Sequence, residues 1–159
     1  QNADWHISPL LRTRQTADLL MPELVPGSVI VDDRLIEMDF GQWHDQPIAE
    51  VWAEIAEGPR HNWSFIMPDT QPPGGESFNA QCKRIASWLD ERAAQPATNP
   101  QIIITHAGVI NAVLSHILGI SPQHAISVKV ANLAVLQTSL MEPDRATNAG
   151  GPWQMVSFG

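Results

Sequence analysis

The spacing of apolar residues along the chain predicts four helices. The clearest occupies residues 77–94, where Ser77 is a favourable N-cap. Its apolar stripe has helical spacing and consists of Phe78, Cys82, Ile85 and Leu89. A second helix is predicted over residues 9–20, because Ser8 can cap it and proline suits its first position. The other two predicted helices occupy residues 48–57 and 109–118.

Short apolar runs between these helices predict strands. The unbroken run at residues 102–104 is typical of a parallel strand that is covered on both faces. The other predicted strands occupy residues 5–7, 29–31, 126–130, 133–137 and 153–158. Because helices and strands alternate, we expect one α/β domain over residues 1–159, with helices on both faces of a mostly parallel sheet.

The charge balance narrows the range of partners. The 159 residues include 9 Lys and Arg against 17 Asp and Glu, which gives a formal net charge of −8. Nucleic-acid binding draws its affinity from clustered basic residues, so we expect no nucleic acid as a partner. No apolar run approaches the roughly 20 residues that cross a bilayer, and we expect no membrane partner. The single cysteine, Cys82, fits a reducing compartment and predicts a cytoplasmic protein.

Two segments place basic side chains where a predicted strand runs into a helix. His106 follows the strand at 102–104, and Arg12 and Arg14 lie in the first turns of the helix after the strand at 5–7. Ligands of parallel sheets bind at the carboxyl ends of strands, where helix N-termini also favour anions. We therefore expect an anion site that contains Arg12 and His106. The alternatives are that the arginines extend into solvent or pair with acidic residues, and that His106 is a core or helix-capping residue.

Glu37 is the candidate general acid. It lies among bulky apolar residues of the segment 35–43, a setting that suits a carboxylic acid working near neutral pH. Asp39 belongs to the same segment and is the rival for this role. The alternative is that both acids lie in a surface turn without a chemical function.

The spacing of the histidines argues against a metal site. None of the 6 histidines forms an HxH or HExxH pair, and we expect neither a metal nor another cofactor. The Gly-rich stretch at residues 74–77 lacks the spacing of phosphate-cradling loops, so nucleotide binding is not expected.

Residues 58–75 form a long passage rich in proline and glycine. Irregular segments of this length inside a compact domain are often lids or binding loops. Trp63, Phe65 and Met67 in this passage would suit a substrate with a sizeable apolar leaving group. The alternative is that the loop packs these side chains onto its own domain.

Four sequence blocks occur in a specific order: residues 8–17 (SPLLRTRQTA), 35–43 (LIEMDFGQW), 73–77 (PGGES) and 105–108 (THAG). In this order the chain resembles the histidine phosphatase superfamily, the phosphoglycerate-mutase-like proteins, and within it the small bacterial phosphatase branch. The resemblance implies a three-layer α/β/α sandwich and metal-independent hydrolysis of a phosphomonoester through a phosphohistidine. It also implies that Arg12, His106 and Ala107 hold the phosphate and that Glu37 protonates the leaving oxygen.

The nucleophile of that family has no match in this sequence. No Arg-His-Gly occurs among the 159 residues, and His6 has neither the arginine before it nor the glycine after it. We expect the nucleophile to belong to a preceding segment of the natural protein, with a further strand and helix. A parallel sheet without a central strand would expose unpaired backbone groups, which proteins avoid.

The resemblance leaves three functions open. The leading one is a phosphatase that acts on a small phosphorylated substrate, with a homodimer as an option for its assembly. The second is a relic without catalysis that binds a phosphorylated ligand or a protein partner. The third is phosphotransfer of the phosphoglycerate mutase type.

Overall fold

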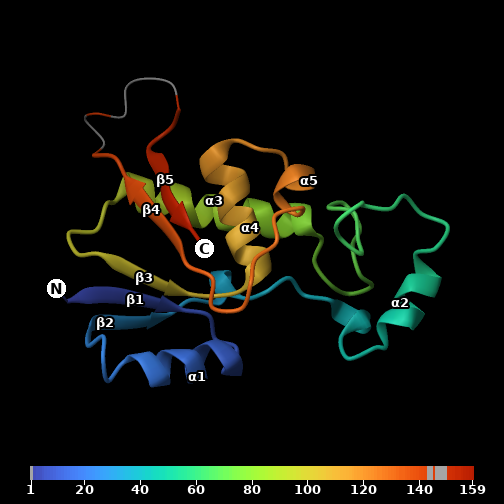
Figure 1. The fold of residues 1–159 in the computed structure, drawn as a ribbon, viewed down its shortest axis with the longest axis horizontal. Helices are drawn as coiled ribbons and strands as arrows, with labels where there is room; N and C mark the ends of the chain where they lie inside the picture. Colours follow the sequence, from blue (N-terminus) through green and yellow to red (C-terminus); the bar gives the residue numbers. More distant parts are fainter. Residues whose placement is uncertain (1, 143–144, 146–149) are drawn as a thin grey trace.

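The structure is a computed structural model that describes residues 2–142, 145 and 150–159 (Figure 1). Its strands are β1 (Ala3–Ile7), β2 (Pro26–Val31), β3 (Gln101–Ile104), β4 (Leu136–Leu140) and β5 (Trp153–Phe158). Its helices are α1 (Leu11–Leu20), α2 (Ile48–Glu54), α3 (Phe78–Ala94), α4 (Ala107–Leu118) and α5 (Pro122–Ala125). Two short 3₁₀ turns, η1 (Asp33–Leu35) and η2 (Gly41–Trp43), lie between β2 and α2. Among the described helices, none is long and apolar enough to cross a membrane.

Strand β1 is the centre of a parallel sheet with the order β2-β1-β3. Its Trp5 lies opposite Val29 of β2 and Ile102 of β3. Strands β4 and β5 form a separate antiparallel pair, so β3 is an edge of the parallel sheet as far as the described strands go. The prediction of an α/β fold with a mostly parallel sheet is confirmed.

Helices cover both faces of this sheet, as Figure 1 shows. Side chains alternate along β1, so Trp5 and Ile7 face α1, where they pack with Ala17. His6 points to the opposite face and meets the Trp88 ring of α3 edge-on, with ring centroids 5.7 Å apart. These contacts produce the three layers of an α/β/α sandwich.

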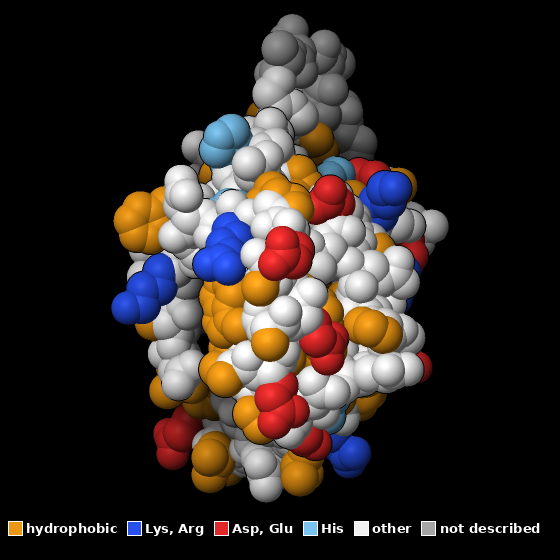
Figure 2. Space-filling model, turned by 90° about the vertical axis from the view of Figure 1, so that its right-hand side faces the viewer, with side chains coloured by type: hydrophobic (Ala, Val, Ile, Leu, Met, Phe, Trp, Pro, Cys, Tyr) orange, Lys and Arg blue, Asp and Glu red, His pale blue; other side chains and the backbone are white. Residues whose placement is uncertain are grey.

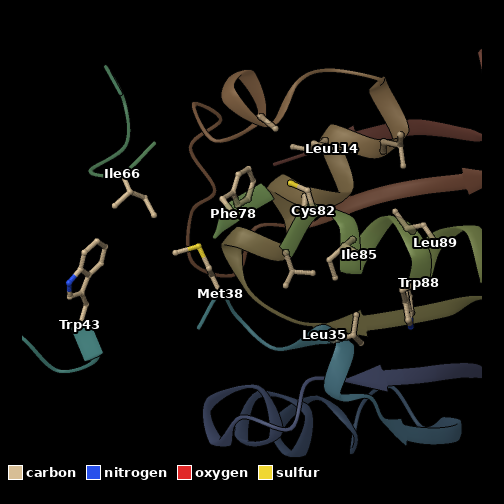
Figure 3. Close-up of a cluster of buried hydrophobic side chains, with 14 of the residues drawn as sticks. Leu35, Met38, Trp43, Ile66, Phe78, Cys82, Ile85, Trp88, Leu89 and Leu114 are labelled. Carbon is tan, nitrogen blue, oxygen red and sulfur yellow. The ribbon is translucent and has the colours of Figure 1, made fainter. Parts of the chain in front are cut away.

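The larger core lies between α3 and α4 (Figure 3). All members of the predicted apolar stripe of α3 are buried: Phe78, Cys82, Ile85 and Leu89. Helix α4 contributes the buried side chains of Val109, Ala112, Leu114 and Ile117. Leu35 and Met38, from the segment after β2, belong to the same cluster. That segment is therefore held close to α3.

One predicted strand is wrong. Residues 126–130 form no strand and instead make a turn after α5. The helix begins here because the Ser121 hydroxyl accepts the His124 backbone N–H and Pro122 takes the first helical position. Residues 126–128 follow as a turn instead of a strand, because their backbone N–H groups donate back to the carbonyls of Pro122, His124 and Ala125.

Several predicted boundaries are displaced by up to three residues. The strand expected at 133–137 begins at Leu136, because Leu133 has a φ of 61°, which interrupts an extended backbone. The helix expected at 48–57 ends at Glu54. The rest of the predicted helices and strands lie where the sequence pattern puts them, to within a few residues.

Figure 2 shows the end of the molecule near α2. Acidic and basic side chains are interspersed there with apolar ones.

Arg84 of α3 holds the segment between β2 and η2 in place. Its guanidinium donates to the backbone carbonyls of Arg34 and Ile36, and it also forms a two-point contact with the carboxylate of Glu76. The closer of the two Glu76 contacts measures 2.7 Å, and both side chains are about four-fifths buried. A charged group bound on both sides in this way fixes the backbone just before Glu37.

Replacing Arg84 by methionine (Arg84→Met) should lower the free energy of unfolding by about 2 kcal/mol, because two carbonyls and one carboxylate lose their donor. Urea unfolding measures this difference. Lys83→Met is the matched control, since Lys83 is the exposed neighbour on the same helix and should change stability little. Equal midpoints for the two variants would contradict the anchoring role.

Candidate functional site

The carboxyl ends of β1 and β3 meet at one edge of the sheet. Ile7 lies opposite Ile104, and the Ser8 backbone N–H donates to the Ile104 carbonyl at 3.0 Å. The chain enters α1 after β1 and α4 after β3. This edge therefore brings Arg12, in the first turn of α1, next to His106, the residue before α4.

His106 is bonded through both ring nitrogens. The Arg12 Nε–H donates to Nδ1 at 3.2 Å, and the Ser8 hydroxyl lies 2.8 Å from Nε2. The histidine is 7% exposed, whereas Arg12 reaches in from the exposed side of α1. The sequence predicts that Ser8 caps α1, but Leu10 is the N-cap, and the Ser8 hydroxyl accepts only the Leu10 backbone N–H there, at 3.5 Å. The Ser8 hydroxyl is engaged by His106 because the sheet places the two residues side by side.

The surroundings of His106 keep its ring neutral at physiological pH. Burial and the positive charge of Arg12 lower its pKa from the usual 6.5 to about 4, although the nearby Glu37 acts in the opposite direction. A neutral imidazole can accept the hydrogen bond from Arg12, which an imidazolium could not.

Glu37 lies against the first turn of α4. Its carboxylate accepts the backbone N–H of Gly108 at 3.2 Å and that of Met38 at 3.0 Å. The side-chain amide of Gln81, from α3, donates to the same carboxylate at 3.1 Å. A Cβ at position 108 would collide with the Glu37 carboxylate, so glycine is needed for this close approach.

The rival acid and the second arginine lie elsewhere. Asp39 is exposed, and its carboxylate accepts the Gly41 backbone N–H at 2.8 Å within a turn. Arg14 is exposed on α1. The structure thus brings together Arg12, His106 and Glu37 around the start of α4, where Ala107 is the first helical residue and is exposed.

Sequence reasoning missed two residues of this site. Ser8 was assigned to a helix cap, and no local signal links it to a histidine 98 positions away. Gln81 left a readable signal, because it is a polar residue on the apolar stripe of α3 and is fully buried. Among the described residues, its side-chain oxygen has no hydrogen-bond partner.

The segment at 58–75 packs partly onto its own domain. Phe65 stacks on Phe40 with ring centroids 5.8 Å apart, and Ile66 is buried in the core. Trp63 remains 79% exposed. The reading of this loop as a substrate lid stays a prediction. Among the described residues, no group of three or more His, Cys, Asp or Glu side chains could hold a metal ion.

The depressed pKa of His106 makes stability depend on pH. Between about pH 6.5 and about pH 4, His106 takes up a proton in the unfolded chain but not in the folded one, so the free energy of unfolding should fall as the pH drops through this range. Urea unfolding at several pH values measures the slope. His106→Gln should flatten it, while His44→Gln, at an exposed histidine, should leave it unchanged. Burial also lowers the pKa of His6, which adds to the slope equally in all three proteins. The same slope with and without His106 would contradict the prediction.

Comparison with known proteins places this chain in a family. The family model of the histidine phosphatase superfamily (branch 1) matches residues 2–147. A probable phosphoglycerate mutase GpmB of Klebsiella pneumoniae is 30% identical over 128 residues, which cover 80% of this chain and 59% of that protein. Phosphoserine phosphatase 1 of Hydrogenobacter thermophilus is 30% identical over 113 residues, covering 71% of this chain and 53% of the relative.

Solved structures agree with the observed architecture. The mycobacterial glucosyl-3-phosphoglycerate phosphatase Rv2419c superposes with a TM-score of 0.77 at 24% identity, covering 98% of this chain and 76% of that one. At this identity the likeness concerns the fold. The chain spans little more than half the length of the two curated relatives above. From the match over residues 2–147, the chain belongs to the histidine phosphatase superfamily, branch 1.

Proposed function

We propose that this site binds the phosphate group of a small phosphomonoester, and that the natural protein hydrolyses the ester through a phosphohistidine. The observation that carries the proposal is the contact between Arg12 and His106, two residues 94 positions apart that meet at the carboxyl edge of the sheet. The relatives named as a phosphoserine phosphatase and a glucosyl-3-phosphoglycerate phosphatase support a small phosphorylated substrate.

Three groups of this chain suit a phosphate. The guanidinium of Arg12 can donate to two phosphate oxygens at once. The first N–H groups of α4, beginning with Ala107, lie at the positive end of the helix dipole. The His106 ring lies between them. Because Arg12 and His106 hold each other in the free protein, an anion would take over an arginine that is already in place.

Glu37 is the proposed proton donor. When a histidine nitrogen attacks phosphorus, the bond to the leaving oxygen breaks and that oxygen needs a proton. The Glu37 carboxyl lies at the same helix start as Ala107 and can supply this proton. Water then attacks the phosphohistidine and releases inorganic phosphate, while Glu37 regains its proton from that water.

The nucleophilic histidine is proposed to come from outside these 159 residues. No Arg-His-Gly occurs in the sequence, and the relatives are longer than this chain. Strand β3, which leads directly to His106, has a free edge in the described sheet. A further parallel strand on that edge would end beside His106 and could carry the nucleophile.

Phosphotransfer of the mutase type is the second candidate. It is favoured by the similarity to a probable phosphoglycerate mutase. Both reactions use the same phosphate site, and they differ in whether water or a second hydroxyl accepts the phosphoryl group.

The 159-residue chain should bind inorganic phosphate, and Arg12→Ala should weaken this binding about tenfold to a hundredfold, since one charge-assisted contact is lost. Isothermal titration calorimetry at pH 6 measures the affinity. Arg14→Ala is the matched control, because Arg14 is the exposed arginine two residues further along the same helix. Equal losses in the two variants would refute the assignment of Arg12.

The natural full-length protein should hydrolyse p-nitrophenyl phosphate in the presence of a chelator, and His106→Ala should abolish this activity. Glu37→Gln should slow the hydrolysis of an alkyl phosphate, such as phosphoserine, at least tenfold more than it slows the hydrolysis of p-nitrophenyl phosphate. The reason is that p-nitrophenolate can leave without a proton, whereas an alkoxide needs one. Asp39→Asn serves as the control at the exposed acid. Full activity of His106→Ala would overturn the role of His106 in holding phosphate. An equal loss of activity on both substrates in Glu37→Gln would overturn the role of Glu37 as proton donor.

A further inference from the structure

We infer that Gln81 is a positioning residue that holds Glu37 against the start of α4, and that this role accounts for a polar residue in the main core. The part of this inference that concerns proton transfer rests on the proposed function. The part that concerns the placement of Glu37 is a property of the free chain.

Gln81 occupies a position of α3 where the helical pattern predicts an apolar residue. It lies three residues after Phe78 and four before Ile85, both of which belong to the main core (Figure 3). Its side chain is fully buried, and its Oε1 has no hydrogen-bond partner among the described residues. A buried amide with an unpaired oxygen carries a desolvation penalty that an apolar side chain avoids. Helix packing alone therefore does not explain a glutamine at this position.

The nitrogen of the same amide contacts Glu37. Gln81 Nε2 donates to Glu37 Oε1 at 3.1 Å, whereas the other donors to this carboxylate in the described structure are the backbone N–H groups of Met38 and Gly108. A Cβ at position 108 would lie 3.1 Å from Gln81 Oε1 and would collide with the Glu37 carboxylate. The side chains of Gln81 and Glu37 thus approach the first turn of α4 from the same side.

The contact with Gln81 ties the Glu37 side chain to a second helix. The Met38 N–H is the next group along the chain, so its bond does not fix Glu37 relative to α4. Without Gln81, the Gly108 N–H would be the remaining described tie. The Gln81 N–H can also bond the carbonyl oxygen of a protonated carboxyl group, so the contact can persist in both forms of Glu37. Because an acid must lie within hydrogen-bond reach of the leaving oxygen, loss of this tie should impair proton transfer.

Hydrogen exchange of the 159-residue chain, followed by NMR without ligand, tests the placement of Glu37. The Gly108 N–H lies in the first turn of α4, where no helix carbonyl accepts it, so its protection reports the bond to Glu37. Gln81→Met, which keeps the length of the side chain, should speed this exchange about fivefold or more. Asn111→Leu is the matched control, because Asn111 is a buried amide of α4 whose oxygen is also unpaired among the described residues. Unchanged exchange of Gly108 in Gln81→Met would overturn the inference.

Urea unfolding separates this role from support of the core. Gln81→Met removes an unpaired buried oxygen and adds an apolar group to the stripe of α3, so its unfolding midpoint should equal or exceed that of the unaltered chain. Gln81→Leu is a second variant with the same expectation. A lower midpoint in both variants, with faster exchange throughout α4, would show that Gln81 only supports the core and would overturn the inference.

The natural full-length protein tests the link to proton transfer. Gln81→Met should slow the hydrolysis of phosphoserine about fivefold or more and that of p-nitrophenyl phosphate by less than about twofold, because only the alkoxide needs a proton. Asn111→Leu should leave the ratio of the two rates unchanged. An equal loss on both substrates in Gln81→Met would overturn the link. If the full-length protein hydrolyses neither substrate while Gly108 responds as expected, the proposed function fails and the placement of Glu37 by Gln81 is supported.

Discussion

The parallel pairing of β1 with β3 is the constraint on which the site depends. Ile7 and Ile104 lie opposite each other, so both chains leave the sheet at the same point and enter their helices there. Side chains alternate along a strand, and a slip of one residue in this register would turn one of the two segments to the wrong face. The register therefore decides whether Ser8 and Arg12 can reach His106 at all.

Helix α3 is the second support of the site, although none of its residues belongs to the four sequence blocks except its cap, Ser77. Arg84 fixes the backbone that leads to Glu37, and Gln81 donates to the Glu37 carboxylate itself. The apolar stripe of α3 meanwhile packs against α4, whose first turn contacts the same carboxylate through Gly108. The acid is thus held between two helices that are joined by the main core.

Whether a feature of the fold or of the site can be predicted from the sequence depends on how far apart its interacting residues are along the chain. The helix beginning at Ser77 and the end of α4 at Gly119 rest on contacts within a few residues, and both were predictable. The meeting of Arg12 and His106 could be expected because parallel strands end at one edge of a sheet. The contact between Ser8 and His106 could not be predicted, because the same hydroxyl can either cap a helix or bind a distant histidine. At residues 126–130 the residue pattern predicts a strand, but their first backbone N–H groups bond back to α5, which begins at the Ser121 cap.

Because the net charge of the chain is −8, the proposed binding of an anion depends on the local geometry of this site. A chain with that charge does not draw anions toward itself over long distances, so the proposed binding of an anion depends on contacts of short range. Those contacts come from positions that the sheet register and the start of α4 determine, and a solved relative at 24% identity has the same fold.

The segment at 58–75 is tied to the core through Ile66 but leaves Trp63 exposed. Such loops change faster than the elements they connect. We therefore expect members of this family to share the corner around Arg12 and His106, where we propose that phosphate binds, and to differ in the residues of this loop.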